Sequence, residues 1–181
     1  MHLQALSVAS SVLAYATCTI ASVPNFSLYA YGKDLQSGLK LYYGDGLAYV
    51  GLQAPSFVTE AVNITLSLTD DEKFVAMPGG TVEWSSQPTM YIGANSGDLK
   101  VVGFTVGNET ASTNSTVDGF GLFGGWAFNN MDAGEIEMKF VASPTNETNV
   151  YQVKWNAAST KVSGSDVPIS LRTAAPAVPR D

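Results

Sequence analysis

The sequence predicts an all-β fold, an antiparallel β-sandwich of about ten short strands, with a β-barrel as the second choice. Three observations favour this fold class. Apolar and polar residues alternate with a period of two in several short segments, clusters of Gly, Pro, Asn and Asp separate these segments, and no stretch carries a convincing helical stripe. Many short strands joined by turns are typical of sandwiches and barrels.

The first third of the chain is expected to contain three strands, at Phe26–Tyr31, Leu39–Tyr43 and Leu47–Val50. The tripeptide Gly44-Asp45-Gly46 separates the last two strands. Gly and Asp readily adopt the positive φ angles that a tight hairpin turn requires, so this is the best hairpin connector in the sequence.

The second of these strands carries the leading candidate binding residue. Alternation places Lys40 and Tyr42 on the face opposite to Leu39 and Leu41. Tyr42 is therefore the aromatic residue that we expect to be most exposed. Because aromatic rings suit both sugars and protein contacts, Tyr42 is a candidate binding residue, together with Asp45 at the tip of the hairpin.

The middle of the chain combines one clear strand with several shorter ones. Apolar and polar residues alternate from Asn63 to Leu68, which predicts a half-buried strand that turns Asn63 toward solvent. The segment Ala54–Val62, with a proline near its start, could form one or two turns of helix. The polar segment Gly107–Thr116 is expected to be an exposed loop. Further strands are expected at Lys73–Met77, Thr81–Trp84, Met90–Ile92 and Lys100–Val106.

The last third of the chain continues the β pattern. Between residues 135 and 140 every second residue is apolar, which predicts a strand with Ile136 and Met138 inside and the charged residues, Glu137 among them, outside. The same alternation runs from Tyr151 to Trp155. Strands are also expected at Phe120–Phe128 and Val167–Arg172.

The N-terminal segment, Met1 to about Ala21, is apolar, lacks Asp, Glu, Lys and Arg, and is too short to span a bilayer. It is typical of a signal peptide cleaved before Ser22. The sequence then predicts a single domain over residues 22–172 and a flexible Pro/Ala tail over residues 173–181.

His2 and Cys18 are the only histidine and the only cysteine, and both lie in this leader. The mature chain is therefore expected to lack disulfides. Serine hydrolysis lacks a histidine base and a G-x-S-x-G elbow, while thiolate catalysis and zinc sites lack their ligands. No cofactor is predicted.

Five N-x-Ser/Thr sequons follow the leader, where roughly two would be expected by chance. Together with the signal peptide they predict a secreted, extracellular N-glycoprotein. The predicted glycosylation sites are Asn25, Asn63, Asn108, Asn114 and Asn146.

The net charge of −7 argues against nucleic acid and anionic membranes as partners, because an acidic surface without a basic run repels phosphate. No second long apolar segment follows the leader, so the sequence predicts neither a transmembrane helix nor a lipid-anchor signal. The product is expected to be freely soluble.

One glycine-rich motif invites a cofactor interpretation. Residues Gly119–Gly124 match G-x-G-x-x-G, but a dinucleotide site also requires a preceding strand, a following helix and a downstream acid. None of these is predicted here. Close backbone packing or a bulge explains the glycines better.

Carboxylate chemistry is the one enzymatic route left open by the residue inventory. Glu135 and Glu137 are expected on one strand face, about 6.6 Å apart along the strand, within the general span of paired glycosidase carboxylates. Lys139 continues the same row, so an ordinary solvated face is favoured and no catalytic residue is assigned. Asp45 and the run Asp70–Glu72 could contact Ca²⁺, but turn formation explains both better.

Three segments carry a similarity to known proteins: residues 26–32 (FSLYAYG), 38–51 (GLKLYYGDGLAYVG) and 167–176 (VPISLRTAAP). In these segments the chain resembles a group of uncharacterised small secreted proteins of filamentous ascomycete fungi. The resemblance implies a fungal source and export, and it implies no activity or site residue.

These observations favour a secreted, non-enzymatic interaction protein, a candidate fungal effector or wall-associated protein that acts by surface contact with an extracellular protein. One alternative is an inhibitor of an extracellular protease, with the Gly44–Gly46 turn entering the active-site cleft. A second is a lectin-like module that binds glycan, and a carboxylate-dependent glycosidase is the least favoured.

Overall fold

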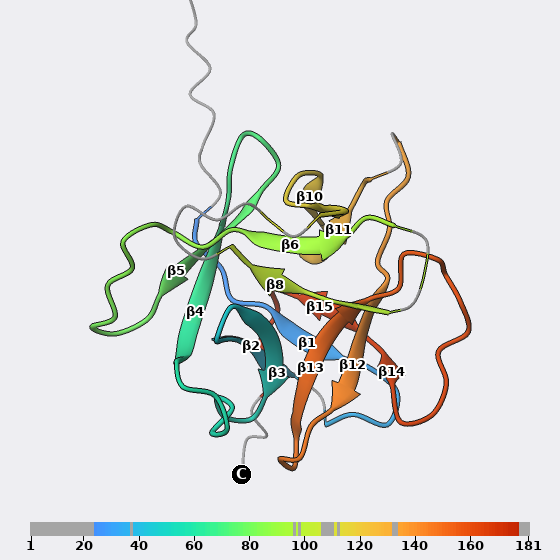
Figure 1. Ribbon diagram of the computed structural model, residues 1–181, viewed down its shortest axis with the longest axis horizontal. Coiled ribbons are helices and arrows are strands. Elements are labelled where there is room, and N and C mark those ends of the chain that lie inside the picture. Colours follow the sequence, from blue (N-terminus) through green and yellow to red (C-terminus); the bar gives the residue numbers. More distant parts are fainter. Residues whose placement is uncertain are drawn as a thin grey trace, which may run out of the picture.

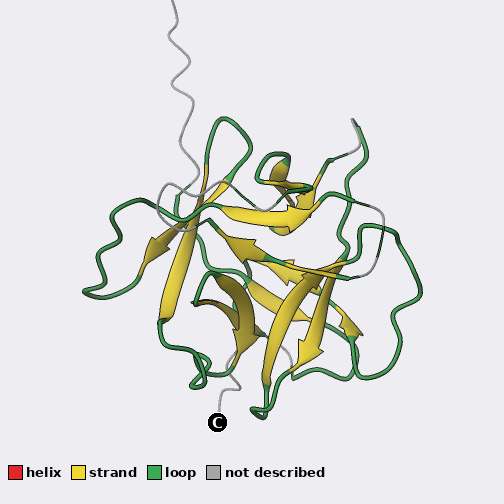
Figure 2. Ribbon diagram, viewed as in Figure 1, coloured by secondary structure: helices red, strands yellow, loops and turns green. Residues whose placement is uncertain are grey.

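The computed structural model describes residues 24–36, 38–95, 97, 99–105, 111, 113–131 and 134–177. This part of the chain contains β-strands and no helix (Figure 2). Every strand pairing within it is antiparallel. The strands form one curled, half-closed sheet, so the all-β prediction is confirmed, in a form consistent with a sandwich or barrel-like fold.

The sheet is built from 15 strands of two to eight residues. Those in the first part of the chain are β1 (Tyr29–Tyr31), β2 (Leu39–Gly44), β3 (Leu47–Gly51), β4 (Ala61–Leu68), β5 (Phe74–Pro78), β6 (Met90–Gly93), β7 (Lys100–Val101) and β8 (Gly103–Phe104). The later strands are β9 (Ser115–Thr116), β10 (Phe120–Phe123), β11 (Trp126–Asn129), β12 (Phe140–Pro144), β13 (Val150–Trp155), β14 (Val167–Pro168) and β15 (Ser170–Arg172).

The main path of the sheet runs β10-β11-β15-β1-β2-β3-β13-β12-β14, and the remaining strands branch from it (Figure 1). Strand β15, near the end of the chain, lies between β11 and β1. Strand β3 pairs along one edge of β2, so β1 and β4 share its other edge. The sheet therefore forks at Tyr42, and β4 continues into the pairing with β5.

Alternate residues of the strands face a single core. The largest fully buried side chains include Phe74, Phe120, Phe140 and Trp155. Phe74 stacks on Phe120 with ring centroids 5.0 Å apart, and Phe140 meets Trp155 edge to face at 4.9 Å. The first pair joins β5 to β10, so strands from both halves of the chain contribute to the one core that the described residues share.

Two elements predicted in the first half of the chain are absent. The segment Ala54–Val62 is a loop as far as residue 60 rather than a helix, because the amides of Thr59 and Glu60 donate to the side chain of Asp45 instead of to helical carbonyls. The predicted strand Thr81–Trp84 forms no strand. It follows two glycines and precedes a Ser-Ser bend, and it pairs with no strand that the structure describes.

Two other predictions fall at the limits of what the structure describes. The predicted signal peptide lies outside the described residues. The predicted loop Gly107–Thr116 lies partly outside them, and its last two residues form β9.

Candidate functional site

The outward face of five neighbouring strands carries a continuous row of aromatic and basic side chains. Cross-strand register aligns Phe123 of β10 with Trp126 of β11, Trp126 with Arg172 of β15, Arg172 with Tyr29 of β1, and Tyr29 with Lys40 of β2. We call these five residues the aromatic ladder. Neighbouring strands lie about 4.8 Å apart, so the ladder is roughly 19 Å long.

The orientation of the ladder follows from strand alternation. The residues next to its members, such as Ala30, Leu39, Ala127 and Leu171, are fully buried in the core, so the ladder side chains point away from it. Phe123 is 65% exposed and is the most exposed of the large hydrophobic residues that the structure describes. The other four ladder residues are half-buried.

Arg172 occupies the centre of the ladder and links the aromatic rings on both sides. Its guanidinium carbon lies 4.2 Å from the ring centroid of Trp126 and 5.4 Å from that of Tyr31, the outward residue next to Tyr29 on β1. A planar guanidinium stacks well on aromatic rings. The cation therefore holds Trp126 and Tyr31 in fixed positions on the sheet face.

The ladder is positively charged although the whole chain carries a net charge of −7. Lys40 and Arg172 lie on it, and strands β1, β2, β11 and β15 contain no Asp or Glu. A basic strip on an acidic molecule favours acidic partners at this face and disfavours self-association through it.

Tyr42, the first predicted binding residue, lies beside the ladder on the same face of β2, two positions after Lys40. It is half-buried, so the prediction of an especially exposed ring is wrong. The pKa of Tyr42 is raised above the ordinary value of tyrosine. Burial is the larger cause, and electrostatic interaction with the nearby Tyr29 is the second. Its cross-strand neighbours are Tyr49 and Asn63, which occupy part of the space around the ring.

Asp45, the second predicted binding residue, is exposed at the tip of the β2–β3 hairpin, with φ of 46°. Its carboxylate is nevertheless occupied. Oδ2 accepts from the amide of Thr59 at 2.8 Å and Oδ1 from that of Glu60 at 2.7 Å. The turn is tied down further because the carbonyl of the buried Gly46 accepts from the amide of Phe104. Asp45 thus fastens the loop at residues 52–60 to the hairpin.

The two carboxylates of the predicted pair differ in burial. Glu135 is exposed, whereas Glu137 is only 9% exposed, and Ile136 and Met138 face solvent. The predicted phase of this segment is therefore wrong. Residues 135–139 form no strand, and a single bridge between Glu137 and Asn129 fixes which side chains face inward.

Glu137 is instead part of a buried polar cluster. The ammonium of Lys139 donates to Oε1 of Glu137 and, at 3.3 Å, to the carbonyl of Ala157. Oε2 of Glu137 and Oδ1 of its bridge partner Asn129 are buried and have no hydrogen-bond partner among the described residues. Lys139 therefore neutralises Glu137 in the interior and does not extend a solvated row of charges.

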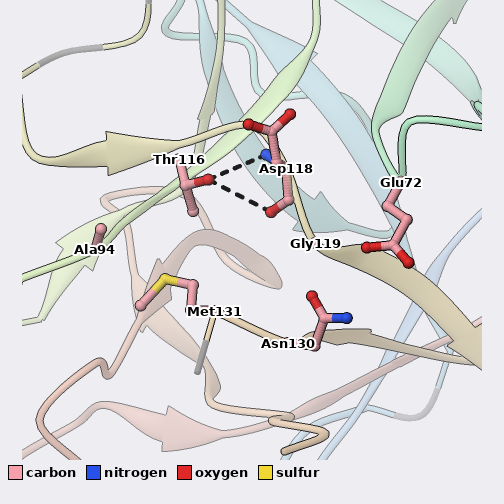
Figure 3. A pocket seen from close by; sticks show the side chains of 7 residues that line it. All are labelled: Glu72, Ala94, Thr116, Asp118, Gly119, Asn130 and Met131. Atoms are coloured by element: carbon pink, nitrogen blue, oxygen red, sulfur yellow. Dashed lines mark hydrogen bonds between the residues drawn. The ribbon is translucent and has the colours of Figure 1, made fainter. Parts of the chain in front are cut away.

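An open hollow of about 430 Å³ lies beside the end of β9 (Figure 3). In Figure 3 the carboxylate of Glu72 and the amide of Asn130 turn toward each other across it. Thr116 and Asp118 line another side of the hollow, and the hydroxyl of Thr116 accepts a hydrogen bond of 3.1 Å from the amide of Asp118. Among the described residues, no group of three or more His, Cys, Asp or Glu side chains is placed to hold a metal ion. The hollow is therefore lined by both polar and apolar residues, among them Glu72, Asn130 and Met131.

The glycine motif at residues 119–124 lies on β10 and at the turn into β11. A side chain at Gly121 would collide with the ring of Phe128 on the neighbouring strand, so the motif serves close packing, as predicted, and no helix follows it.

The described sequon residues Asn25, Asn63, Asn114 and Asn146 are all exposed, and the outward orientation predicted for Asn63 is confirmed. Asn108 lies outside the described residues.

The sequence analysis assigned none of the five ladder residues to a binding site, and Arg172 shows why. The alternation Ser170-Leu171-Arg172 indicates that Arg172 shares a face with Ser170, opposite the buried Leu171. No sequence signal, however, indicates that β15 lies between β1 and β11.

No protein-family model, curated protein or solved structure matches the chain. In the part of the chain that the structure describes, no helix has the length and hydropathy needed to cross a membrane.

Proposed function

We propose that the protein is a secreted, N-glycosylated, non-enzymatic interaction protein that binds an extracellular protein through the aromatic ladder. One observation carries the proposal: Phe123, Trp126, Arg172, Tyr29 and Lys40 align in one outward row across five strands. Tyr, Trp and Arg are the residue types that dominate binding hot spots. A row on a sheet face suits a broad macromolecular surface better than a small molecule, which prefers a concave pocket.

The charge of the ladder narrows the class of partner. Its two cations and the absence of acids on β1, β2, β11 and β15 favour a partner surface that presents carboxylates around an apolar centre. In this proposal Phe123, 65% exposed at the end of the row, inserts into the apolar centre. The resemblance to small secreted fungal proteins suggests that such a partner lies in the fungal wall or in a host.

The internal hydrogen bonds of the Gly44–Gly46 turn weigh against the protease-inhibitor alternative. The carboxylate of Asp45 and the carbonyl of Gly46 are already bonded within the molecule, and Gly46 is buried. The lectin alternative would use the rings of the ladder as a stacking surface. The lectin alternative therefore involves the same side chains as the proposed function, but the ligand is a glycan instead of a protein.

The test begins with capture of partners from host extracellular fluid and fungal wall extract on the purified glycoprotein and its deglycosylated form. Affinity of the captured protein is then measured for Phe123→Ala, Trp126→Ala and the control Phe57→Ala. Phe57 is also exposed, at 44%, but lies in the loop at residues 52–60 and contacts Tyr49. We expect each ladder variant to lose about tenfold or more in affinity and the control to lose less than about twofold.

Equal binding by the ladder variants and the unaltered protein would overturn the proposal. Capture of polysaccharide alone, with weaker glycan binding by Trp126→Ala, would replace it with the lectin interpretation. If both ladder variants inhibit a captured protease as strongly as the unaltered protein does, the protease binds outside the aromatic ladder.

A further inference from the structure

The segment that follows β15 folds back over the outward sheet face instead of leaving the domain. Thr173 continues the pairing with the β10–β11 turn, since its amide donates to the carbonyl of Gly125 at 2.9 Å. The carbonyl of Ala174 then accepts from the hydroxyl of Tyr31 at 2.8 Å. Pro176 lies against Gly38, before β2. Residues 174–176 thus cross from β15 over β1 to the start of β2, and we call them the strap.

The contact between Pro176 and Gly38 depends on the absence of a side chain. A Cβ atom at Gly38 would lie 2.5 Å from two carbons of the Pro176 ring, and the φ of 78° at Gly38 also disfavours any other residue. The Pro176 ring therefore packs directly on the backbone of Gly38, where only glycine leaves room for it.

Tyr31 supplies a hydrogen-bond donor two residues away from that ring along the strap. Its own ring is held by the guanidinium of Arg172, 5.4 Å from its centroid, so its hydroxyl is presented in a fixed position. A donor for a backbone carbonyl beside a seat for a proline ring is the arrangement by which aromatic-lined surfaces bind extended proline-containing peptides.

The strap itself has the chemistry of such a ligand. It reads Ala174-Ala175-Pro176. The residue before a proline is restricted to extended conformations, so little conformational entropy is lost when the segment binds. All three strap residues remain exposed despite their contacts, which indicates that they are held weakly enough to be displaced.

We propose that the surface formed by Tyr31 and Gly38 is a binding site for an extended, proline-containing peptide segment of a partner protein, and that the strap occupies this site in the free protein. The site adjoins the Tyr29–Lys40 end of the aromatic ladder, so a bound segment would lie beside it. The inference rests on the proposed function, because it assigns the class of segment that the partner presents.

The experiment needs no partner protein. A capped synthetic peptide with the sequence of residues 173–177, Thr-Ala-Ala-Pro-Ala, is titrated into the isotope-labelled full chain, and the amide resonance of Gly38 and the ring resonances of Tyr31 are followed by NMR. The full chain is compared with the variant Ala175→Gly/Pro176→Gly, in which the strap is loosened. A peptide with alanine in place of proline is the ligand control.

We expect the loosened variant to bind the peptide about tenfold more tightly than the unaltered chain, because the strap no longer competes at a high effective concentration. Adding Tyr31→Phe to the loosened variant should weaken peptide binding about fivefold through loss of the hydroxyl donor. The alanine peptide should bind at least tenfold more weakly than the proline peptide.

Absence of resonance shifts in the loosened variant at millimolar peptide would overturn the inference, as would equal binding of the proline and alanine peptides. Neither result affects the proposed function, which depends on Phe123 and Trp126. Conversely, peptide binding at Tyr31 combined with unchanged partner affinity in Phe123→Ala would support the peptide site and contradict the proposed role of the aromatic ladder.

Discussion

Glu137 is an acidic residue placed on the inner side of the sheet, and Lys139, two residues later, reaches back to neutralise it. The side chain of Glu137 is 9% exposed and that of Lys139 is 24% exposed. An ion pair of this kind contributes little compared with an apolar pair of the same shape, but removing one partner leaves a charge without compensation. The free energy of the cluster therefore depends on both residues together.

Lys139→Met tests this dependence. We expect the free energy of unfolding at neutral pH to fall by about 3 kcal/mol, because the Glu137 carboxylate keeps its burial and loses its cation. Chemical denaturation provides the measurement. In the double variant Glu137→Gln/Lys139→Met the loss should shrink to about 1 kcal/mol, since no uncompensated charge remains. A double variant as unstable as the single one would show that packing, and not charge, holds this segment.

At the scale of elements, the β2–β3 hairpin and the loop at residues 52–60 form one unit. Asp45 at the hairpin tip binds the amides of Thr59 and Glu60, and the carboxylate of Glu60 accepts from the indole of Trp84 at 2.8 Å. Trp84 in turn packs on Tyr43 of β2, with ring centroids 5.0 Å apart. The loop is thereby closed onto the strand that precedes the turn.

Asp45→Asn should loosen this unit while keeping the turn, because asparagine also tolerates the positive φ at this position. We expect the free energy of unfolding to fall by about 1 kcal/mol and the amides of Thr59 and Glu60 to exchange with solvent faster, since a charged acceptor of two hydrogen bonds is lost. Hydrogen exchange followed by NMR measures both amides. Asp70→Asn, in another exposed turn, is the matched control. Faster exchange of the Thr59 and Glu60 amides in that variant too would show that Asp45 does not hold the loop to the hairpin.

At the scale of the whole molecule, four tyrosines respond to the fold in the same way. Burial is the first cause that raises the pKa of each above the ordinary value of 10.0, and for Tyr91 it is the only one. The carboxylate of Asp45 adds to the shift at Tyr43 and Tyr49. The folded state therefore favours the neutral phenols. The four residues are Tyr42, Tyr43, Tyr49 and Tyr91.

This direction sets the alkaline limit of stability. A raised pKa in the folded state means that the contribution of these tyrosines is complete below pH 10 and is lost as the pH rises through their folded-state pKa values. We expect the free energy of unfolding to fall steadily above pH 10, together with the appearance of phenolate absorbance. Denaturation curves across this range give the slope, and Tyr91→Phe should reduce it. A flat profile across that range would contradict the assignment.

Local patterns were sufficient where a strand is amphipathic and bounded by turns. Gly44-Asp45-Gly46 and the alternation after Asn63 correctly indicated the β2–β3 hairpin and the outward face of β4. The same argument failed at Glu135–Lys139, where the alternation predicts a strand with Ile136 and Met138 inside, whereas the structure has no strand there and turns both residues to solvent. There the bridge to Asn129 and the cation of Lys139 selected the phase with Glu137 inside.

The sequence by itself determined the all-β class, the hairpin and the sides on which Lys40 and Tyr42 lie, because these follow from a period of two and from local turn chemistry. Only the tertiary structure decided that β15 lies between β11 and β1, which aligns Phe123, Trp126, Arg172, Tyr29 and Lys40 in one row. It also decided that the residues after β15 fold back onto Tyr31 and Gly38. Strand order joins segments more than 100 residues apart, and such contacts arise from packing of the whole core, which no local pattern records.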